Sequence, residues 1–459
     1  MHSGSKLKLK LKIFFFGSLI IGLAFSCGKE RKGKIDSLIP PNESQGPPIV
    51  NSASIEGFAN KVSYYPGDSV YISASCATEK LLSLSLFRLG KENEEIMRVN
   101  GIKAKRQDYF KFSYSFGCEW DTTYRFKLDE NLRSGLYSAV IKNSLGNTDY
   151  ISFVVKEPRD FKSAKLLVIA NTNTWQAYNN WGGASFYRYQ LNDLGGDIRH
   201  SVIVSFRRPN KTDHPNGNKG HLLNAELHLL RWLEENEIDY AMASDADIHG
   251  SPYQLEGRKA LILQAHPEYY SYEMWQNVFD FNLEGGNLLY LGANGIYWKV
   301  GLSDDGQIEC RKDGDSHRFA EGSGGLWKDK GLSPALIVGT HYSGTGYGTY
   351  HPYQVLDDSH WIYEGTGLKN GDLFGEESLN GGGASGHETD KITRNTPSAF
   401  VHLAKGSNPD DGGADLVFRE SSPRGLVFSV GSISYTGSLA VDSAVHKITM
   451  NVLEKSLAD

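Results

Sequence analysis

Between residues 165 and 292, short apolar runs alternate with longer stretches of helical periodicity. The apolar runs are typical of buried strands and lie at residues 165–170, 202–205, 240–244, 260–264 and 287–292. The periodic stretches are typical of amphipathic helices and lie at residues 222–235 and 271–283. Strands that alternate with helices pair into a parallel or mixed sheet with helices on its faces. We therefore predict an α/β fold for residues 159–459.

Two further parts of this region have their own patterns. Residues 301–390 are rich in glycine and aromatic residues, and we expect them to form loops and an inserted β region over the edge of the sheet. A closing strand is expected at residues 425–430 and a C-terminal helix at residues 442–457. The predicted domain at residues 159–459 thus carries an insertion late in the chain, and its α/β pattern is of a type common in enzymes.

Residues 51–158 show a different pattern of apolar and polar residues. Short runs of alternating polarity recur there, for example at residues 69–73, 124–128, 136–141 and 150–155. Turn signals such as Pro66-Gly67-Asp68 separate these runs. The spacing predicts an immunoglobulin-like β-sandwich of about a hundred residues in front of the α/β domain.

The first residues predict a targeting segment. Four lysines up to Lys12 precede the apolar stretch 13–25, which is short for a membrane span. The stretch ends at Cys27 in a pattern that resembles a bacterial lipoprotein signal, so residues 1–27 are expected to direct export and Cys27 to carry the lipid. Residues 28–50 read as a flexible tether. The alternative is an ordinary cleaved signal in which Cys27 has no special role.

Composition narrows the classes of partner. The net charge of -6 gives no basic excess of the kind that nucleic-acid binding requires. Export permits a disulfide, and Cys76 with Cys118 is the pair expected to share a domain, whereas Cys310 would be single. We expect an exported protein of the cell envelope, anchored to the membrane through its lipid, that does not bind nucleic acid.

A polar corner follows the strand at residues 260–264. His266-Pro267-Glu268 comes directly after it and stands just before the next helix. In open α/β sheets ligands bind at the carboxyl ends of the strands, so His266 and Glu268 are the first candidates for chemistry. Glu268 could ligate a hard metal or act as a base, and His266 could orient a water. The alternative is that Glu268 caps the following helix and His266 is a satisfied buried side chain.

Three common motifs of catalysis and phosphate binding are missing from the sequence. It contains no G-x-S-x-G elbow, no phosphate-binding G-x-x-x-x-G-K-[ST] loop and no H-E-x-x-H zinc helix. Where related topologies often carry a nucleophile, this corner carries Pro267 and Glu268. The lack of a Cys or Ser nucleophile there argues against acyl-enzyme chemistry at the corner.

Two other polar segments also follow predicted strands. Residues 171–189 hold Tyr178, Tyr187 and Tyr189, and residues 292–298 hold Asn294. Three such segments should converge on one cleft. A cation stabilises phenolate, and two phenolates with one carboxylate form an all-oxygen set that suits trivalent iron better than zinc. Without a metal, the tyrosines would line an aromatic cleft for a sugar or peptide.

Several motifs in order resemble one known family. They are WQAYNNWGGASFY, SFRRP, SDADIH, HPEYYS, GANGIYW, EGTGLKNGDLFG and GHETD, which span residues 166 to the C-terminus. In this order they resemble the C-terminal region of the N,N-dimethylformamidase large (beta) subunit and its relatives. The resemblance implies a class I glutamine amidotransferase-like α/β fold without that fold's cysteine. It also implies a mononuclear iron held by two tyrosines and a glutamate.

The resemblance assigns site residues one by one. Glu268 matches the glutamate ligand and Tyr178 one tyrosine ligand. Tyr187 is our choice for the second tyrosine ligand, with Tyr189 as the alternative. The remaining matches are His266 as the neighbouring active-site histidine, Asn294 as a polar active-site residue and Glu388 as an acid beside the ligands. The family's lysine has two candidates, Arg311 and Lys312.

These patterns together lead to a functional hypothesis. We expect an iron-dependent hydrolase of non-peptide C–N amide bonds that acts on a small-molecule amide. We also expect the chain to form a homo-oligomer. The family's enzyme is intracellular and has two subunits, whereas this chain carries an export signal, so a different substrate is expected. Two alternatives stay open: a non-catalytic envelope lipoprotein that binds glycan or peptide, and an enzyme that acts on carbohydrate.

Overall fold

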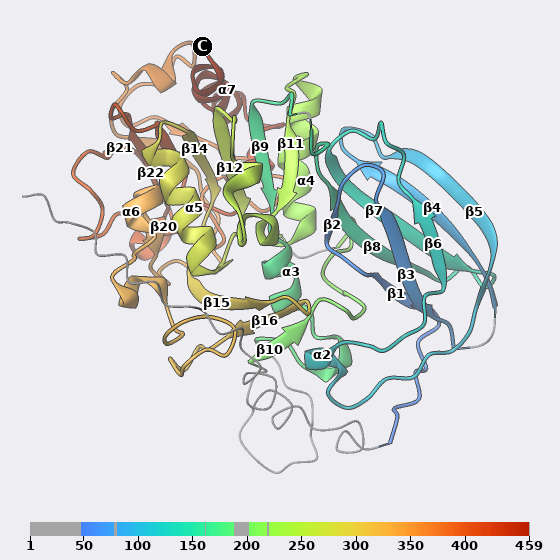
Figure 1. Ribbon diagram of the computed structural model, residues 1–459. Helices are drawn as coiled ribbons and strands as arrows, with labels where there is room; N and C mark the ends of the chain where they lie inside the picture. The colour runs from blue at the N-terminus through green and yellow to red at the C-terminus, as the bar shows by residue number, and fades with distance from the viewer. Residues whose placement is uncertain (1–46, 78–79, 161, 188–201, 218–219, 459) are drawn as a thin grey trace, which may run out of the picture. The chain divides into compact units, whose positions relative to one another are not determined.

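The computed structural model describes residues 47–77, 80–160, 162–187, 202–217 and 220–458. Within it, residues from Pro47 onward form one compact unit (Figure 1). The export signal, Cys27, most of the tether and Tyr189 lie outside the described residues. None of the described helices combines the length and the apolar character needed to cross a bilayer.

A mixed sheet dominates the C-terminal part, with nine strands among the described residues. Its order is β11 (Ala241–Ser244), β9 (Leu166–Ala170), β12 (Ala260–Ala265), β14 (Asn287–Gly292), β23 (Val427–Ser429), β22 (Asp415–Arg419), β21 (Val401–Gly406), β18 (Tyr353–Val355) and β19 (Leu373–Phe374). The strands from β11 to β23 pair in parallel, and those from β23 to β19 pair antiparallel. The predicted α/β class is confirmed at this level.

Helices pack on both faces of this sheet, and β12 shows why. Ile262 belongs to one core, with side chains of α4 (Leu223–Glu235) and α7 (Ser443–Leu457). Its neighbours Leu261 and Leu263 belong to a second core, with Met274, Trp275 and Val278 of α5 (Tyr272–Leu283). Successive strand residues point to opposite faces, so an uninterrupted apolar strand requires cover on both. Short helices complete the fold: α2 (Ser113–Phe116), α3 (Thr172–Tyr178) and α6 (Ala335–Val338).

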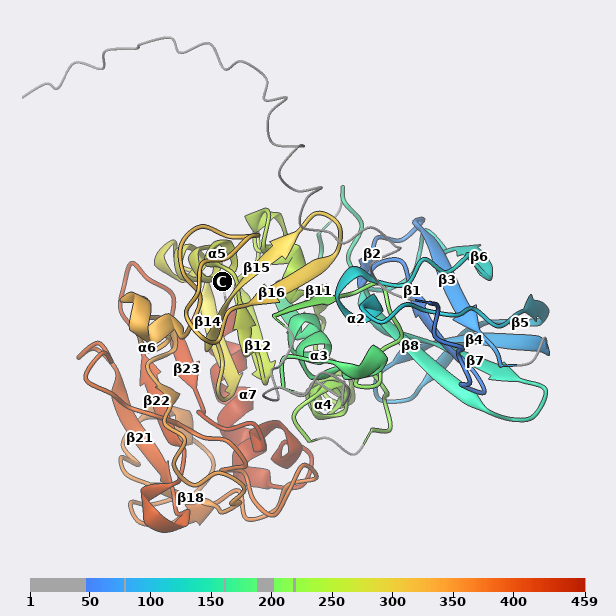
Figure 2. The ribbon, with the colours of Figure 1, turned by 90° about the horizontal axis from the view of Figure 1, so that it is seen from below.

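The N-terminal part consists of two sheets around a shared core (Figure 2). One sheet contains β1 (Glu56–Ala59), β3 (Ser69–Ser75) and β6 (Tyr124–Lys127). The other contains β2 (Ser63–Tyr64), β8 (Thr148–Val155), β7 (Gly135–Asn143), β4 (Lys80–Leu89) and β5 (Glu94–Ala104). Alternate side chains of both sheets, such as Ile72 and Leu84, fill the core between them. The strands predicted for this region are present.

A smaller sheet beside the main one contains β10 (Ile203–Ser205), β16 (Gln307–Cys310), β15 (Trp298–Ser303) and β13 (Tyr269–Tyr270). The strand predicted at residues 202–205 therefore exists, but it joins this sheet rather than the nine-stranded one. A two-stranded pair, β17 (His341–Tyr342) and β20 (Asp390–Lys391), lies within the segment predicted as an insertion. Both elements depend on contacts with residues far away in the chain.

The predicted pairing of Cys76 with Cys118 is wrong in this structure, where both cysteines are free and buried. Cys76 lies in the core between the two N-terminal sheets, and its thiol donates to the carbonyl oxygen of Ser54 at 3.1 Å. Cys118 belongs to a separate cluster with Phe58, Trp120 and Trp181. Sequence spacing could not show that the two thiols enter different apolar clusters.

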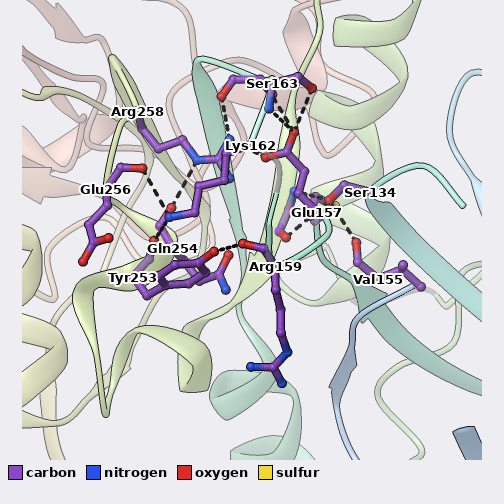
Figure 3. Close-up of polar contacts among 12 residues, drawn as sticks. Ser134, Val155, Glu157, Arg159, Lys162, Ser163, Tyr253, Gln254, Glu256 and Arg258 are labelled. Atoms are coloured by element: carbon purple, nitrogen blue, oxygen red, sulfur yellow. Dashed lines mark hydrogen bonds and ion pairs between the residues drawn. The ribbon is translucent and has the colours of Figure 1, made fainter. Parts of the chain in front are cut away.

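An ion pair joins the segment after β8 to the segment before β12. Glu157 Oε2 lies 2.6 Å from a guanidinium nitrogen of Arg258, and both side chains are buried. The other carboxylate oxygen, Oε1, accepts from the backbone and hydroxyl of Ser163 and from the backbone of Ala164 (Figure 3). Removing one partner of such a pair leaves an uncompensated buried charge.

We expect Glu157→Ala to lower the free energy of unfolding by about 3 kcal/mol, because Arg258 would lose its counter-charge. Urea denaturation of the purified protein measures this loss. The control is Glu256→Ala, an exposed position nearby, which should stay within about 0.5 kcal/mol of the wild type. Equal stability of the two variants would contradict a stabilising role for the buried pair.

Candidate functional site

Three adjacent parallel strands end at the same edge of the nine-stranded sheet. β12 pairs with β9 on one side, where Leu263 is opposite Ile169, and with β14 on the other, where Ala265 is opposite Gly292. The three polar segments singled out in the sequence follow these strands directly. The structure therefore brings them together, as the pattern of strands and helices predicted.

The corner after β12 has an unusual backbone that a threonine supports. Ala265 has a φ of 49°, in the left-handed region that favours glycine. The Thr174 hydroxyl donates to the carbonyl of His266 at 2.8 Å and accepts from the backbone of Glu268 at 3.2 Å. Thr174 lies on α3, so it fixes the corner to the segment that carries Tyr178. The main chain that presents His266 and Glu268 is thereby held from two directions.

The structure contradicts the alternative interpretation of this corner. Ser271, and not Glu268, caps α5: the Ser271 hydroxyl accepts a hydrogen bond from the backbone of Met274. His266 is fully buried, but neither ring nitrogen makes a hydrogen bond with the described residues. Burying a polar group without a hydrogen-bond partner costs free energy. The unpaired ring therefore indicates a site that binds a further group, such as an ion or a ligand.

Glu268 is buried at the centre of the site. Its Oε1 accepts from the Tyr187 hydroxyl at 2.7 Å. Its Oε2 makes no hydrogen bond with any residue that the structure describes and lies 3.4 Å from Nε2 of His266. Burial raises the pKa of Glu268 to about 8, and the nearby charge of Lys312 opposes this rise. A carboxylate with one free oxygen facing inward is suited to bind a cation.

Tyr178 and Tyr187 both lie beside this carboxylate. Their ring centroids are 4.4 Å apart, and the Tyr269 hydroxyl donates to that of Tyr187 at 2.7 Å. Although Tyr187 is 39% exposed, its hydroxyl group points to the buried Glu268. Burial raises the pKa of both tyrosines well above the usual value. Without a cation they are therefore neutral, and a bound cation would favour their phenolates.

A second carboxylate faces His266 from another element. Glu388 Oε2 lies 3.5 Å from Nε2 of His266 and accepts from the Asn294 side chain at 2.6 Å. Burial raises the pKa of Glu388 to about 7, and the hydrogen bond from Asn294 opposes the rise. Asn294 has a φ of 48°, and its backbone donates to Asp390 at 2.7 Å. Asp390 therefore holds the strained turn that presents Asn294.

The structure separates the two candidates for the family's lysine. Lys312 Nζ lies 3.5 Å from the Tyr187 ring centroid and 4.9 Å from that of Trp298. Burial lowers the pKa of Lys312, and the charge of Glu268 opposes this effect. Arg311 instead donates to Glu309 at 2.7 Å. Lys312 is thus the cation beside the candidate site.

Several residues at this edge were not among the predicted site residues. The His221 ring lies 5.6 Å from His266 and 5.5 Å from His387, between centroids. His387 and Asp390 stand within GHETD, and Tyr269 within HPEYYS, so the motifs contained a signal that was not resolved to single residues. Thr174 lies in the segment 171–189 that was predicted to reach this edge, but nothing marked that residue itself, and His221 carries no comparable signal.

The donor set can be tested against a metal. In the described chain, no group of three or more His, Cys, Asp or Glu side chains could hold a metal ion. Tyr178, Tyr187 and Glu268 instead offer only oxygen donors, and the carboxylate retains an unpartnered buried oxygen. Hard trivalent iron prefers oxygen ligands, so the residues present fit such an ion.

Comparisons with known proteins place this site in context. A family model described as N,N-dimethylformamidase beta subunit-like, C-terminal, matches residues 84–449. The N,N-dimethylformamidase beta subunits of Alcaligenes sp and Paracoccus aminophilus are each 28% identical to the chain over 423 residues, which covers 74% of this chain and 55% of each relative. The chain thus spans about half the length of these curated relatives.

Among solved structures, an N-terminal domain named mmIFT52 matches at a TM-score of 0.30 and 14% identity, covering 49% of this chain and 87% of that one. A likeness at this TM-score supports no argument about fold or function. The family match therefore rests on sequence, and the site geometry rests on the described residues.

Proposed function

The chain belongs to the N,N-dimethylformamidase beta subunit-like C-terminal family, and on this premise we propose that it is an iron-dependent hydrolase of non-peptide C–N amide bonds. The observation that supports the proposal best is the hydrogen bonding of the Glu268 carboxylate. This buried carboxylate contacts Tyr187 through one oxygen, and its other oxygen has no hydrogen-bond partner in the described part of the chain. Tyr178, Tyr187 and Glu268 would hold the metal.

The residues around the ligands have complementary roles. A trivalent iron, when bound, supplies Lewis-acid polarisation of a carbonyl oxygen and a lower pKa for water. Burial lowers the pKa of His266 well below its usual value, so its imidazole is neutral and Nε2 can accept a proton from the attacking water. Glu388, whose carboxyl Asn294 orients, can give a proton to the nitrogen that leaves as amine. The water oxygen bonds to the carbonyl carbon and the C–N bond breaks.

The finer description of the fold is also a proposal. We propose that residues 159–459 adopt a class I glutamine amidotransferase-like α/β fold with an insertion at about 301–390, and that residues 51–158 form an immunoglobulin-like sandwich. Five neighbouring parallel strands with helices on both faces support the first part. Two sheets that share one core support the second.

Export and anchoring are proposed from the sequence before residue 47. We propose that residues 1–27 direct export, that Cys27 is lipidated, and that residues 28–50 connect the anchor to the folded part. The membrane is then a partner, and the substrate is an amide met in the cell envelope. The mass of the mature N-terminal peptide tests this: a lipid-modified Cys27 is expected, and an unmodified N-terminus elsewhere would refute the anchor.

Substrate class is tested by screening small formamides, larger amides and sugars on the iron-loaded protein. Release of an amine from amides is the expected result. Glycan or peptide binding without turnover would favour the non-catalytic lipoprotein, and cleavage of sugars would favour a carbohydrate-acting enzyme. The aromatic rings near Lys312 keep these alternatives in the test, because such rings also bind sugars.

The choice of the second tyrosine ligand gives a separate prediction. We expect Tyr187→Phe to weaken iron binding by more than about 100-fold, because the hydroxyl proposed as a ligand is lost while the ring remains, and loss of a group that only supports a ligand already costs about 10–100-fold. Titration of metal-free protein with iron measures the affinity. The matched control is Tyr189→Phe, which should bind iron as the wild type does. The opposite outcome would assign the ligand to Tyr189.

A further inference from the structure

Arg208, from the SFRRP motif, is a fully buried cation that the proposed chemistry does not use. Among the described residues its hydrogen bonds go to carbonyl oxygens and one amide side chain, and to no carboxylate. Burial lowers its pKa to about 9. A buried charge with only neutral partners is costly. The position therefore calls for an explanation beyond filling a core.

Most of its partners lie in the chain segment between Tyr178 and Tyr187 and at the end of α3. One terminal nitrogen donates to the carbonyls of Trp181 at 2.6 Å and Ala184 at 3.0 Å. The other terminal nitrogen donates to the carbonyl of Asn179 at 2.8 Å and, more weakly, to that of Gln176 at 3.4 Å. Nε donates to the Gln176 side chain at 3.0 Å and to the carbonyl of Ser205. A single guanidinium group thus donates to three carbonyls of the segment between Tyr178 and Tyr187.

Other contacts support the same arrangement. Gly182 and Gly183 have φ values of 76° and 94°, so the chain turns tightly between the two tyrosines. The backbone of Phe186 donates to the carbonyl of Ala177 at 3.0 Å, which brings the two ends of the segment together. The Asn179 side chain donates to the carbonyl of Pro209, next to Arg208. The relative placement of the two rings therefore depends on the core of this turn.

We propose that Arg208 is a positioning residue that sets Tyr178 and Tyr187 at the spacing required to hold the metal. The inference rests on the proposed function, since it concerns the proposed ligands. Arginine suits this role because its planar fork carries five N–H donors in fixed directions. Lysine keeps the charge but offers three donors from one point, so it cannot reach carbonyls on opposite sides of the turn.

The test compares Arg208→Lys with a matched control, Arg258→Lys. Arg258 is also buried and hydrogen-bonded, but it pairs with Glu157 away from the site (Figure 3). For each full-length protein, three quantities are measured: the affinity for added iron, the tyrosinate-to-iron charge-transfer absorption and the unfolding temperature. We expect both variants to unfold at lower temperature. Only Arg208→Lys should bind iron at least about tenfold more weakly and shift the absorption band.

Several results would overturn the inference. Wild-type affinity and absorption in Arg208→Lys would do so, and so would equal losses in both variants. If Arg208→Lys does not fold, Gln176→Leu removes one acceptor of the guanidinium and should produce the band shift with a smaller loss of affinity; an unchanged band would then overturn the inference. A wild-type chain that binds no iron would contradict the proposed function itself, and the positioning role with it.

Discussion

Replacing Glu268 with glutamine is expected to remove both the bound iron and the amide turnover. Glutamine keeps the size of the side chain, so Tyr187 can still form a hydrogen bond with it, but the negative charge is lost. The loss should exceed the roughly 10–100-fold effect that is typical of removing a group that only supports a metal ligand. Iron content and the rate of amine release are measured on the same preparation.

The control for this variant is Glu273→Gln, five residues further along the chain. Glu273 lies in the first turn of α5 with a half-exposed side chain, and it contacts His249 rather than the site. It should retain wild-type iron and wild-type turnover. A Glu268→Gln protein with full iron and full turnover would eliminate Glu268 as a ligand and remove the main support for the proposed function.

Glu388→Gln is expected to separate chemistry from metal binding. Glutamine can still contact Asn294, but it cannot give a proton to the leaving amine. Removing a positioned acid or base typically costs about 100-fold or more in rate. We therefore expect turnover to fall by about 100-fold, while iron content and the tyrosinate absorption stay at wild-type values. Stopped assays of amine release, together with absorption spectra, measure both quantities.

The control for the second variant is Glu364→Gln, an exposed position within the EGTGLKNGDLFG motif, which should behave as the wild type. Two outcomes would contradict the role given to Glu388. Unchanged turnover would show that it handles no proton in the reaction. Loss of iron in parallel with turnover would show that it belongs to the metal ligands instead.

Much of the central fold could be predicted from the sequence, because local patterns determine it. The apolar run from Ala260 to Leu263 in β12 required cover on both faces of the strand, and the helices α4 and α5 were visible from their periodicity. The antiparallel strands β22, β21, β18 and β19 are different. They are short or separated by long loops, and their pairing depends on partners distant in the chain.

The candidate site could be predicted in its general location and in some of its residues. His266, Glu268 and Asn294 follow adjacent parallel strands, and the order of strands and helices was enough to place them at one edge. The position of Lys312 was harder to predict from the sequence. It follows β16, a strand of the smaller sheet whose position depends on β13 and β15. His221 lies on no segment that was predicted to reach this edge, so its place beside His266 depends on the packing of the folded chain.

The error over Cys76 and Cys118 has the same physical origin. Both residues lie in the N-terminal part, and export would permit their oxidation, but burial in two separate apolar clusters keeps the thiols apart. Composition shows what chemistry is permitted, whereas the contact between two side chains depends on the register of distant strands. Arg208 is a parallel case, because it stands in the SFRRP motif but only the folded chain shows its partners.

Elemental analysis of the purified wild-type chain tests the central claim most directly. We predict one iron per chain, accompanied by an absorption band from tyrosinate bound to iron. A folded chain that contains no metal, takes up none when iron is supplied, and yet binds glycan or peptide would contradict it.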